Sequence, residues 1–136
     1  LLACRPASLF IANRSPAKAE GLAREFSDLG TVDAGDFAKT AGHRFDIVIN
    51  ATSASLSGAS LPLPTGIYAP GSLAYDMMYG KGETPFLAQA RMQGAVLLAD
   101  GLGMLVEQAA EAYLVWRGVR PETAPVLAGL RRQLTA

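Results

Sequence analysis

The sequence predicts an α/β fold in which a mainly parallel sheet carries helices on both faces. Short apolar runs suited to buried strands alternate along the 136 residues with stretches that keep helical spacing. The residues are 50% hydrophobic and 18% charged, which fits one domain with a substantial core. Polar residues follow several of the apolar runs, at the strand ends where open parallel sheets bind ligands. We therefore expect the functional residues of this chain at the carboxyl ends of its strands.

The first half of the pattern is strand, helix, strand. The apolar run 8–12 predicts a buried strand. A helix is expected over 16–28, with Ser15 as its N-cap and Pro16 in its first position. A weak strand at 31–34 follows.

The middle of the chain continues the alternation. The run 45–50 is the strongest strand signal. The stretch 53–72, rich in Ser, Gly and Pro, predicts a long functional loop, because strands resume beyond it. A strand is then expected at 73–76, a helix at 84–93 and a last strand at 94–98.

Two helices are expected to close the chain. The second begins at Pro121 and ends near Leu134. The first carries one apolar stripe, which predicts the buried face of that helix: Leu102, Leu105, Val106, Ala109, Tyr113 and Trp116.

Charge and cysteine content exclude several classes of protein. Twelve basic residues balance twelve acidic ones, and no basic stripe is interleaved with aromatics, so nucleic acid is not an expected partner. The single Cys4 cannot form an internal disulfide, and with His43 as the only histidine there is no zinc constellation. A reducing, cytoplasmic setting is therefore expected. No apolar run reaches membrane-spanning length, so no membrane partner is expected either.

Residues 13–18 predict a site for the adenosine end of NADP. In dinucleotide-binding units an acidic residue at the end of the second strand binds the ribose 2′-hydroxyl and favours NAD. Here that position holds Asn13 and Arg14, and a guanidinium binds a 2′-phosphate through two parallel hydrogen bonds. Lys18 adds a second charge and Ser15 stands at the helix N-terminus, which itself favours an anion. The alternative is a solvated Arg and Lys on an ordinary surface helix.

Three later strand ends complete the expected cofactor site. Thr52 and Ser53 offer hydroxyl and backbone N–H groups to a ribose or phosphate. Met77 offers a soft surface to the nicotinamide, and Gly101 permits a close backbone approach to its ring. Each has a structural alternative: a simple turn for Thr52 and Ser53, core packing for Met77, and helix entry for Gly101.

Five motifs in order, covering nearly the whole chain, resemble the shikimate dehydrogenase family. They are Asn-Arg-Ser-x-x-Lys-Ala, Asn-Ala-Thr-Ser, Tyr-Asp-Met-x-Tyr, Thr-Pro-Phe and Ala-Asp-Gly-Leu-Gly-Met-Leu-x-x-Gln-Ala. The resemblance implies a Rossmann-like fold, NADP as cofactor, and the NADPH-dependent reduction of 3-dehydroshikimate to shikimate in aromatic amino-acid biosynthesis. It also implies that Tyr79 and Gln108 face the substrate. Helical spacing agrees, because Gln108 lies on the face of Met104, off the apolar stripe; the alternative is a solvent-facing glutamine.

The resemblance is to the C-terminal cofactor-binding domain, so residues 1–136 are expected to form that domain without its first strand and Gly-rich turn. The family places its catalytic Lys and Asp in an N-terminal substrate domain, so no catalytic residue is expected in this chain, which alone is predicted to be inactive. Asp100 is expected to cap the following helix, Asp76 to hydrogen-bond at its strand end, and His43 to lie in an exposed turn.

Two other functions are left open. One is a relative that acts on quinate as well as shikimate. The other is a non-catalytic nucleotide-binding module of the same fold. The sequence also leaves open a homodimer.

Overall fold

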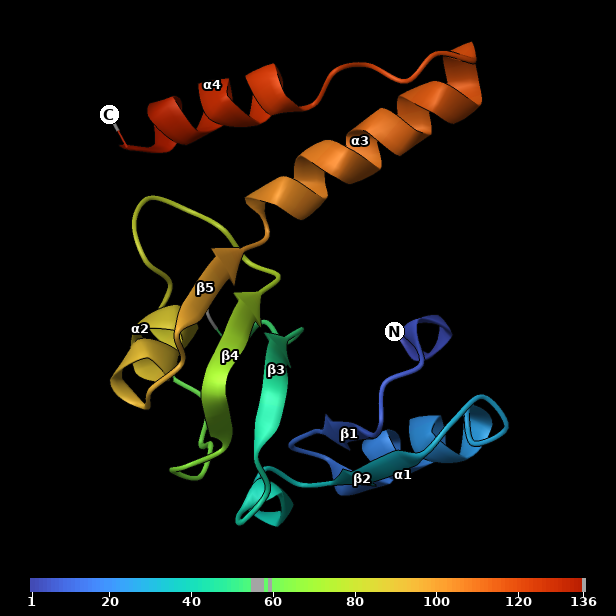
Figure 1. The fold of residues 1–136 in the computed structure, drawn as a ribbon, viewed down its shortest axis with the longest axis vertical. Helices are drawn as coiled ribbons and strands as arrows, with labels where there is room; N and C mark the ends of the chain where they lie inside the picture. Colours follow the sequence, from blue (N-terminus) through green and yellow to red (C-terminus); the bar gives the residue numbers. More distant parts are fainter. Residues whose placement is uncertain (55–57, 59, 136) are drawn as a thin grey trace. The chain divides into compact units, whose positions relative to one another are not determined.

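The computed structural model describes residues 1–54, 58 and 60–135, and divides into two compact units (Figure 1). Unit 1 comprises residues 1–44 and 62–67, and unit 2 comprises residues 45–61 and 68–136. In chain order the elements are η1 (Leu2–Cys4), β1 (Leu9–Ala12), α1 (Pro16–Glu25), β2 (Val32–Gly35), η2 (Ala38–Thr40), β3 (Phe45–Asn50), β4 (Tyr68–Asp76), α2 (Pro85–Met92), β5 (Leu97–Asp100), α3 (Leu102–Arg117) and α4 (Ala124–Thr135).

Unit 1 is a parallel strand pair with a helix packed against it. β1 pairs with β2 from Leu9 opposite Val32 to Ala12 opposite Gly35, and α1 contacts both strands. α1 ends at Glu25, three residues before the predicted end, because the backbone of Phe26 leaves the helical region at φ −108° and ψ 12°. The expected strand–helix–strand order is confirmed.

Unit 2 contains a three-stranded sheet in which both strand pairs are parallel. The order is β3-β4-β5, and α2 packs against β4 and β5 (Figure 1). α3 begins at the carboxyl end of β5, and α4 packs against α3. The parallel ladders confirm the α/β class, although the strands of the described residues form two sheets.

β4 is longer than predicted, and the loop before it is correspondingly shorter. The strand begins at Tyr68 rather than at residue 73, and buried Tyr68, Ser72, Ala74 and Asp76 lie along it. Pro70-Gly71 looks like a turn in the sequence, but Gly71 adopts φ 80° beside a register shift in the ladder with β3. It is therefore a bulge within a strand. Residues 55–57 and 59 of the predicted loop lie outside the described residues.

The boundaries of β5 and α4 also differ from prediction. β5 spans Leu97–Asp100 instead of 94–98, because Gly94 at φ 98° and the bond from Ala95 N–H to Ala90 O still belong to the end of α2. α4 begins at Ala124 rather than at Pro121.

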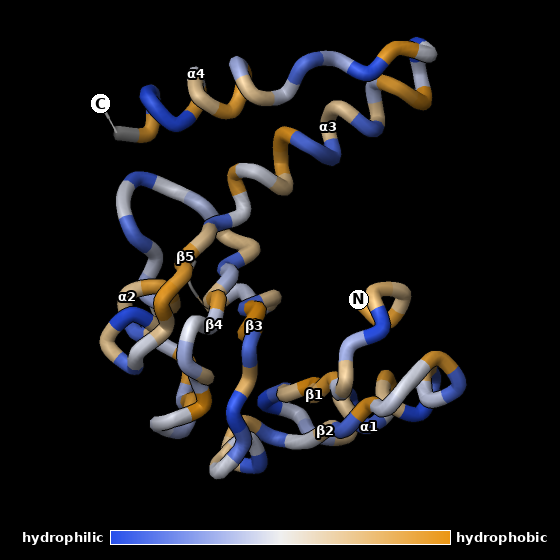
Figure 2. The backbone as a smooth tube through the Cα atoms, in the orientation of Figure 1, coloured by the Kyte–Doolittle hydropathy of each residue, from blue (hydrophilic) through white to orange (hydrophobic). Residues whose placement is uncertain are grey.

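The predicted apolar stripe of α3 is only partly buried. The buried residues are Leu102, Val106 and Ala110, whereas Tyr113 and Trp116 are 45% and 78% exposed. Helix α3 leads away from the sheet, so only its first turns reach the core. Figure 2 shows the hydrophobic colour along β5 and again at the far end of α3.

Within the described part of the chain, no helix combines the length and the apolar character needed to span a membrane.

Candidate functional site

The turn between β1 and α1 is built by Asn13. Its Oδ1 accepts a hydrogen bond from the backbone N–H of Ser15 at 2.9 Å. Ser15 occupies the N-cap position of α1, as predicted, but its side chain makes no capping hydrogen bond. The Ser15 hydroxyl is therefore available to a ligand at the start of the helix.

Arg14 and Lys18 carry exposed cationic side chains at the start of α1. Among the described residues, neither side chain takes part in an ion pair or a hydrogen bond. Other guanidinium groups of the chain are paired: Arg91 with Glu83, and Arg120 with Glu107. Two unpaired cations beside a helix N-terminus suit a dianionic phosphate, since both the charges and the helix dipole favour it.

In unit 2, the turn after β3 is organised by Asn50. Its Oδ1 accepts the backbone N–H of Thr52 at 3.0 Å and the Thr52 hydroxyl at 2.8 Å. The Thr52 oxygen in turn accepts the N–H of Ala54 at 3.3 Å. Thr52 thus helps to form the turn, which the sequence analysis gave as the alternative to a ligand contact. Ser53 is exposed and open to a ligand.

The backbone after β4 passes directly against Gly101. The Gly101 N–H donates to the Met78 carbonyl at 3.0 Å, and a Cβ on Gly101 would lie 2.6 Å from the Met77 carbonyl carbon. Gly101 is therefore needed for the approach to Met77, whatever else it contacts. The Met77 side chain is 38% exposed rather than in the core.

The two residues expected to face a substrate are accessible. Tyr79 is 41% exposed, and Gln108 lies on the exposed surface of α3 one turn after Met104. Neither side chain forms a hydrogen bond with another described residue. Both polar groups are therefore free to bind a ligand.

A buried carboxylate connects these segments. Asp76 is 0% exposed, and its Oδ1 accepts hydrogen bonds from Asn50 Nδ2 and from the Met78 N–H, each at 3.1 Å. Its Oδ2 accepts the Thr84 hydroxyl at 2.6 Å. The expected role of Asp76 as a hydrogen-bonding residue at a strand end is confirmed.

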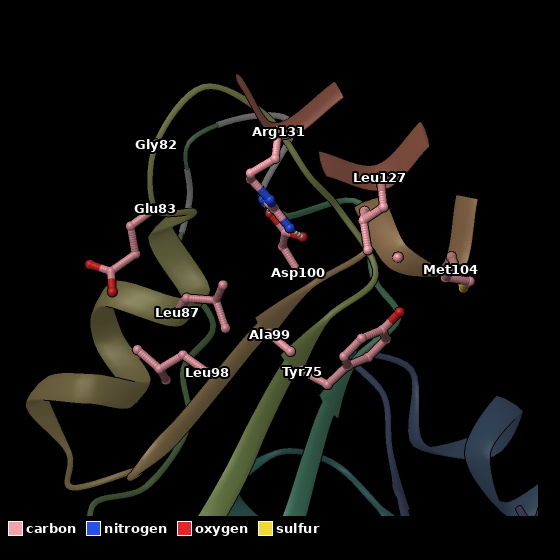
Figure 3. Close-up of a pocket in the computed structure, with 11 residues that line it drawn as sticks. Tyr75, Gly82, Glu83, Leu87, Leu98, Ala99, Asp100, Met104, Leu127 and Arg131 are labelled. Carbon is pink, nitrogen blue, oxygen red and sulfur yellow. Dashed lines mark hydrogen bonds and ion pairs between the residues drawn. The ribbon is translucent and has the colours of Figure 1, made fainter. Parts of the chain in front are cut away.

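A cavity of about 500 Å³ lies at the carboxyl end of β5 (Figure 3). Arg131 of α4 binds both carboxylate oxygens of Asp100 there, and Asp100 Oδ1 also accepts the Leu102 N–H at 3.2 Å. Gly101 occupies the N-cap position of α3, and Asp100, the residue before it, accepts the N–H of the first helical residue. The hydrogen bonds from Arg131 lower the pKa of Asp100 below its ordinary value.

His43 also lies where the sequence places it. It is exposed, and its ring stacks at a tilt on Phe10, 5.8 Å between centroids.

Comparisons with known proteins show what the chain is similar to. A family model described as the Shikimate 5'-dehydrogenase C-terminal domain matches residues 101–131. The chain is 72% identical over 136 residues to the shikimate dehydrogenase (NADP(+)) of Dechloromonas aromatica, covering 100% of this chain and 50% of that protein. Over its whole length the chain is similar to curated shikimate dehydrogenases, and its residues 101–131 match the C-terminal domain of that family. It spans about half the length of the curated relatives it matches.

Solved structures share the fold of this chain. An Ael1 enzyme from Pseudomonas putida superposes with a TM-score of 0.81 at 51% identity, over 96% of this chain and 46% of that one. The shikimate 5-dehydrogenase of Thermus thermophilus, in complex with NADP(H) and shikimate, gives 0.71 at 29% identity, over 90% and 45%. The predicted Rossmann-like class is thereby confirmed.

Sequence reasoning missed two polar contacts among the described residues. Thr84 was expected only as the start of a helix, yet its hydroxyl also donates to Asp76. Arg131 was not singled out, although it binds Asp100 from 31 residues away. Neither pairing has a fixed sequence spacing, so the motifs alone could not show them.

Proposed function

We propose that this chain supplies the NADP-binding part of an enzyme that reduces 3-dehydroshikimate to shikimate. The observation that carries the proposal is the 72% identity, over the whole chain, to a shikimate dehydrogenase that is named for NADP(+). The free cations Arg14 and Lys18 support it, because they suit the 2′-phosphate that distinguishes NADP from NAD.

The residues divide by role. Asn13 shapes the turn, and Arg14, Ser15 and Lys18 bind the 2′-phosphate in this proposal. The other proposed contacts to the cofactor lie at the strand ends of unit 2. They are Thr52, Ser53, Met77 and Gly101. The bound cofactor supplies the hydride, and the protein holds the ring and the substrate carbonyl together.

Tyr79 and Gln108 complete the proposal on the substrate side. A phenol and an amide each donate and accept hydrogen bonds, which suits a small polyol such as shikimate. The general acid, a Lys and Asp pair in the family, would come from the half of the relatives that this chain does not match. The single exposed Cys4 agrees with a reducing, cytoplasmic setting for this enzyme. In this proposal the enzyme binds small molecules, as a homodimer or a monomer.

A chimera tests the activity. The unmatched half of the Dechloromonas aromatica protein is joined to this chain, and shikimate-dependent reduction of NADP+ is followed by absorbance. We expect turnover by the chimera and none by the 136-residue chain alone. Binding of NADPH without turnover of any substrate would instead favour a non-catalytic nucleotide-binding module, and equal rates with quinate would favour the broader enzyme.

Replacing Arg14 with alanine in the same chimera is expected to weaken NADPH binding by about 10- to 100-fold and to leave NADH binding nearly unchanged. The reason is that a charge-assisted hydrogen bond contributes about 1.5–3 kcal/mol, and only NADPH carries the 2′-phosphate. Fluorescence titration of both cofactors measures it.

Arg24→Ala is the matched control, because Arg24 is an exposed arginine in the last turn of the same helix. It should change neither dissociation constant. Equal losses for NADPH and NADH in Arg14→Ala would remove the role given to the guanidinium.

A further inference from the structure

The buried side chain of Asp76 joins separate segments of unit 2 through hydrogen bonds. Among the described residues its carboxylate accepts hydrogen bonds from three different segments: Asn50 at the end of β3, Met78 after β4, and Thr84 at the start of α2. Asp76, Asn50 and Thr84 are 0%, 1% and 8% exposed. Hydrogen bonds to a buried charged group are strong, and their geometry is therefore restrictive.

The hydrogen-bond network extends beyond Asp76 through the side chains of Thr84 and Asn50. The Thr84 hydroxyl donates its proton to Asp76 and accepts the N–H of Leu87 at 3.3 Å, which caps α2. Asn50 donates its amide to Asp76 and accepts from both groups of Thr52. The donor and acceptor directions are consistent along the whole path from the α2 cap to the turn at residue 52.

The backbone between these partners is held from both sides. The Met77 N–H donates to the Asn50 carbonyl at 3.0 Å, and the Met78 carbonyl accepts from Gly101 at 3.0 Å. The segment 77–79 thus has little freedom at Met77 and Met78, while the side chains of Met77 and Tyr79 stay exposed.

We propose that Asp76 is a positioning residue that fixes the two ligand-facing segments, 52–54 and 77–79, in one geometry, with Asn50 and Thr84 as the arms of the network. This rests on the proposed function for the identity of the ligands. The network itself touches neither ligand in this proposal, because its members are buried beneath the exposed residues that would do so. It acts by keeping Ser53, Met77 and Tyr79 in register.

The decisive prediction is an effect at a distance. Among the described residues no hydrogen bond joins Thr84 directly to Thr52 or Met78, and the hydrogen-bond path from Thr84 to both runs through Asp76. Thr84→Val keeps the shape of the side chain and removes the hydroxyl. In the chimera we expect it to speed amide exchange at Thr52 and Met78 by about ten-fold, and to raise the dissociation constant of NADP+ by a similar factor.

Two further variants separate positioning from loss of stability. Thr84→Ser keeps the hydroxyl and should restore both values. Phe86→Leu alters a buried side chain of the same helix, 1% exposed, without touching the network. It should lower the Tm. The affinity for NADP+ should stay at the parent value, and so should the rates of amide exchange at Thr52 and Met78 when both proteins are compared at the same number of degrees below their Tm.

Each outcome has a defined meaning. Exchange changes confined to the first turn of α2 in Thr84→Val would overturn the proposal, as would equal effects of Phe86→Leu. If the parent chimera does not bind NADP+ at all, the proposed function fails. The exchange at Thr52 and Met78 would still decide whether the network fixes the two segments.

Discussion

Gly101→Ala is expected to destabilise unit 2 by about 3 kcal/mol, because overpacking against rigid atoms has no soft way to relax. An added Cβ would lie 2.6 Å from the Met77 carbonyl carbon and nearer still to its oxygen. Both are backbone atoms at the end of a buried strand, so one of the two segments must move. Gly101 has φ −74° and ψ −1°, which any residue can adopt, so the requirement for glycine here is steric.

Urea unfolding of the 136-residue chain, followed by circular dichroism, measures the change. Gly103→Ala is a matched control two residues away, because no atom lies within 4 Å of an added Cβ there. A helical glycine replaced by alanine gains about 0.5–1 kcal/mol, so the two variants should differ in sign. A Gly101→Ala protein as stable as the parent would show that the Met77 backbone yields easily.

The clash also bears on function. Moving Met77 displaces a proposed cofactor contact, and it strains the bond between Gly101 N–H and the Met78 carbonyl. The glycine was expected in the sequence to give a close approach to a nicotinamide ring. The structure shows a close approach to the neighbouring strand end, and this is sufficient reason for a glycine at that position.

Local signals in the sequence were the most reliable. The bounds of β3 and the start of α2 at Thr84-Pro85 lie where residue type and periodicity placed them. Each depends on residues within a few positions of one another, so propensity and capping chemistry suffice to predict them.

Features set by distant partners were not predictable in the same way. The start of β4 was hidden because Pro70-Gly71 is a common turn dipeptide, and only pairing with β3 makes it a bulge. The outer stripe of α3 was expected to be buried, although Trp116 is 78% exposed, because periodicity marks an apolar face without saying what covers it. The candidate site shows the same division. The proposal for Arg14 depends on a motif of neighbouring residues, whereas the hydrogen bond from Asn50 to Asp76 joins residues 26 positions apart.

Asp76→Ala is expected to destabilise the chain by about 3–5 kcal/mol, since removal of one partner leaves several buried donors unsatisfied. Those donors are Asn50 Nδ2, the Met78 N–H and the Thr84 hydroxyl. Each loses its acceptor in a region closed to water, which costs more than the hydrogen bond itself contributes. The same urea unfolding experiment measures the loss.

Asp46→Ala is the comparison, because Asp46 is an exposed aspartate of β3 and should change stability by less than about 0.5 kcal/mol. Asp76→Asn should fall between the two, since an amide oxygen still accepts from Asn50 and Met78 while its NH₂ group faces the Thr84 hydroxyl. If Asp76→Ala were no worse than Asp46→Ala, water would have to reach the three donors, and the buried network could not hold the strand ends in place.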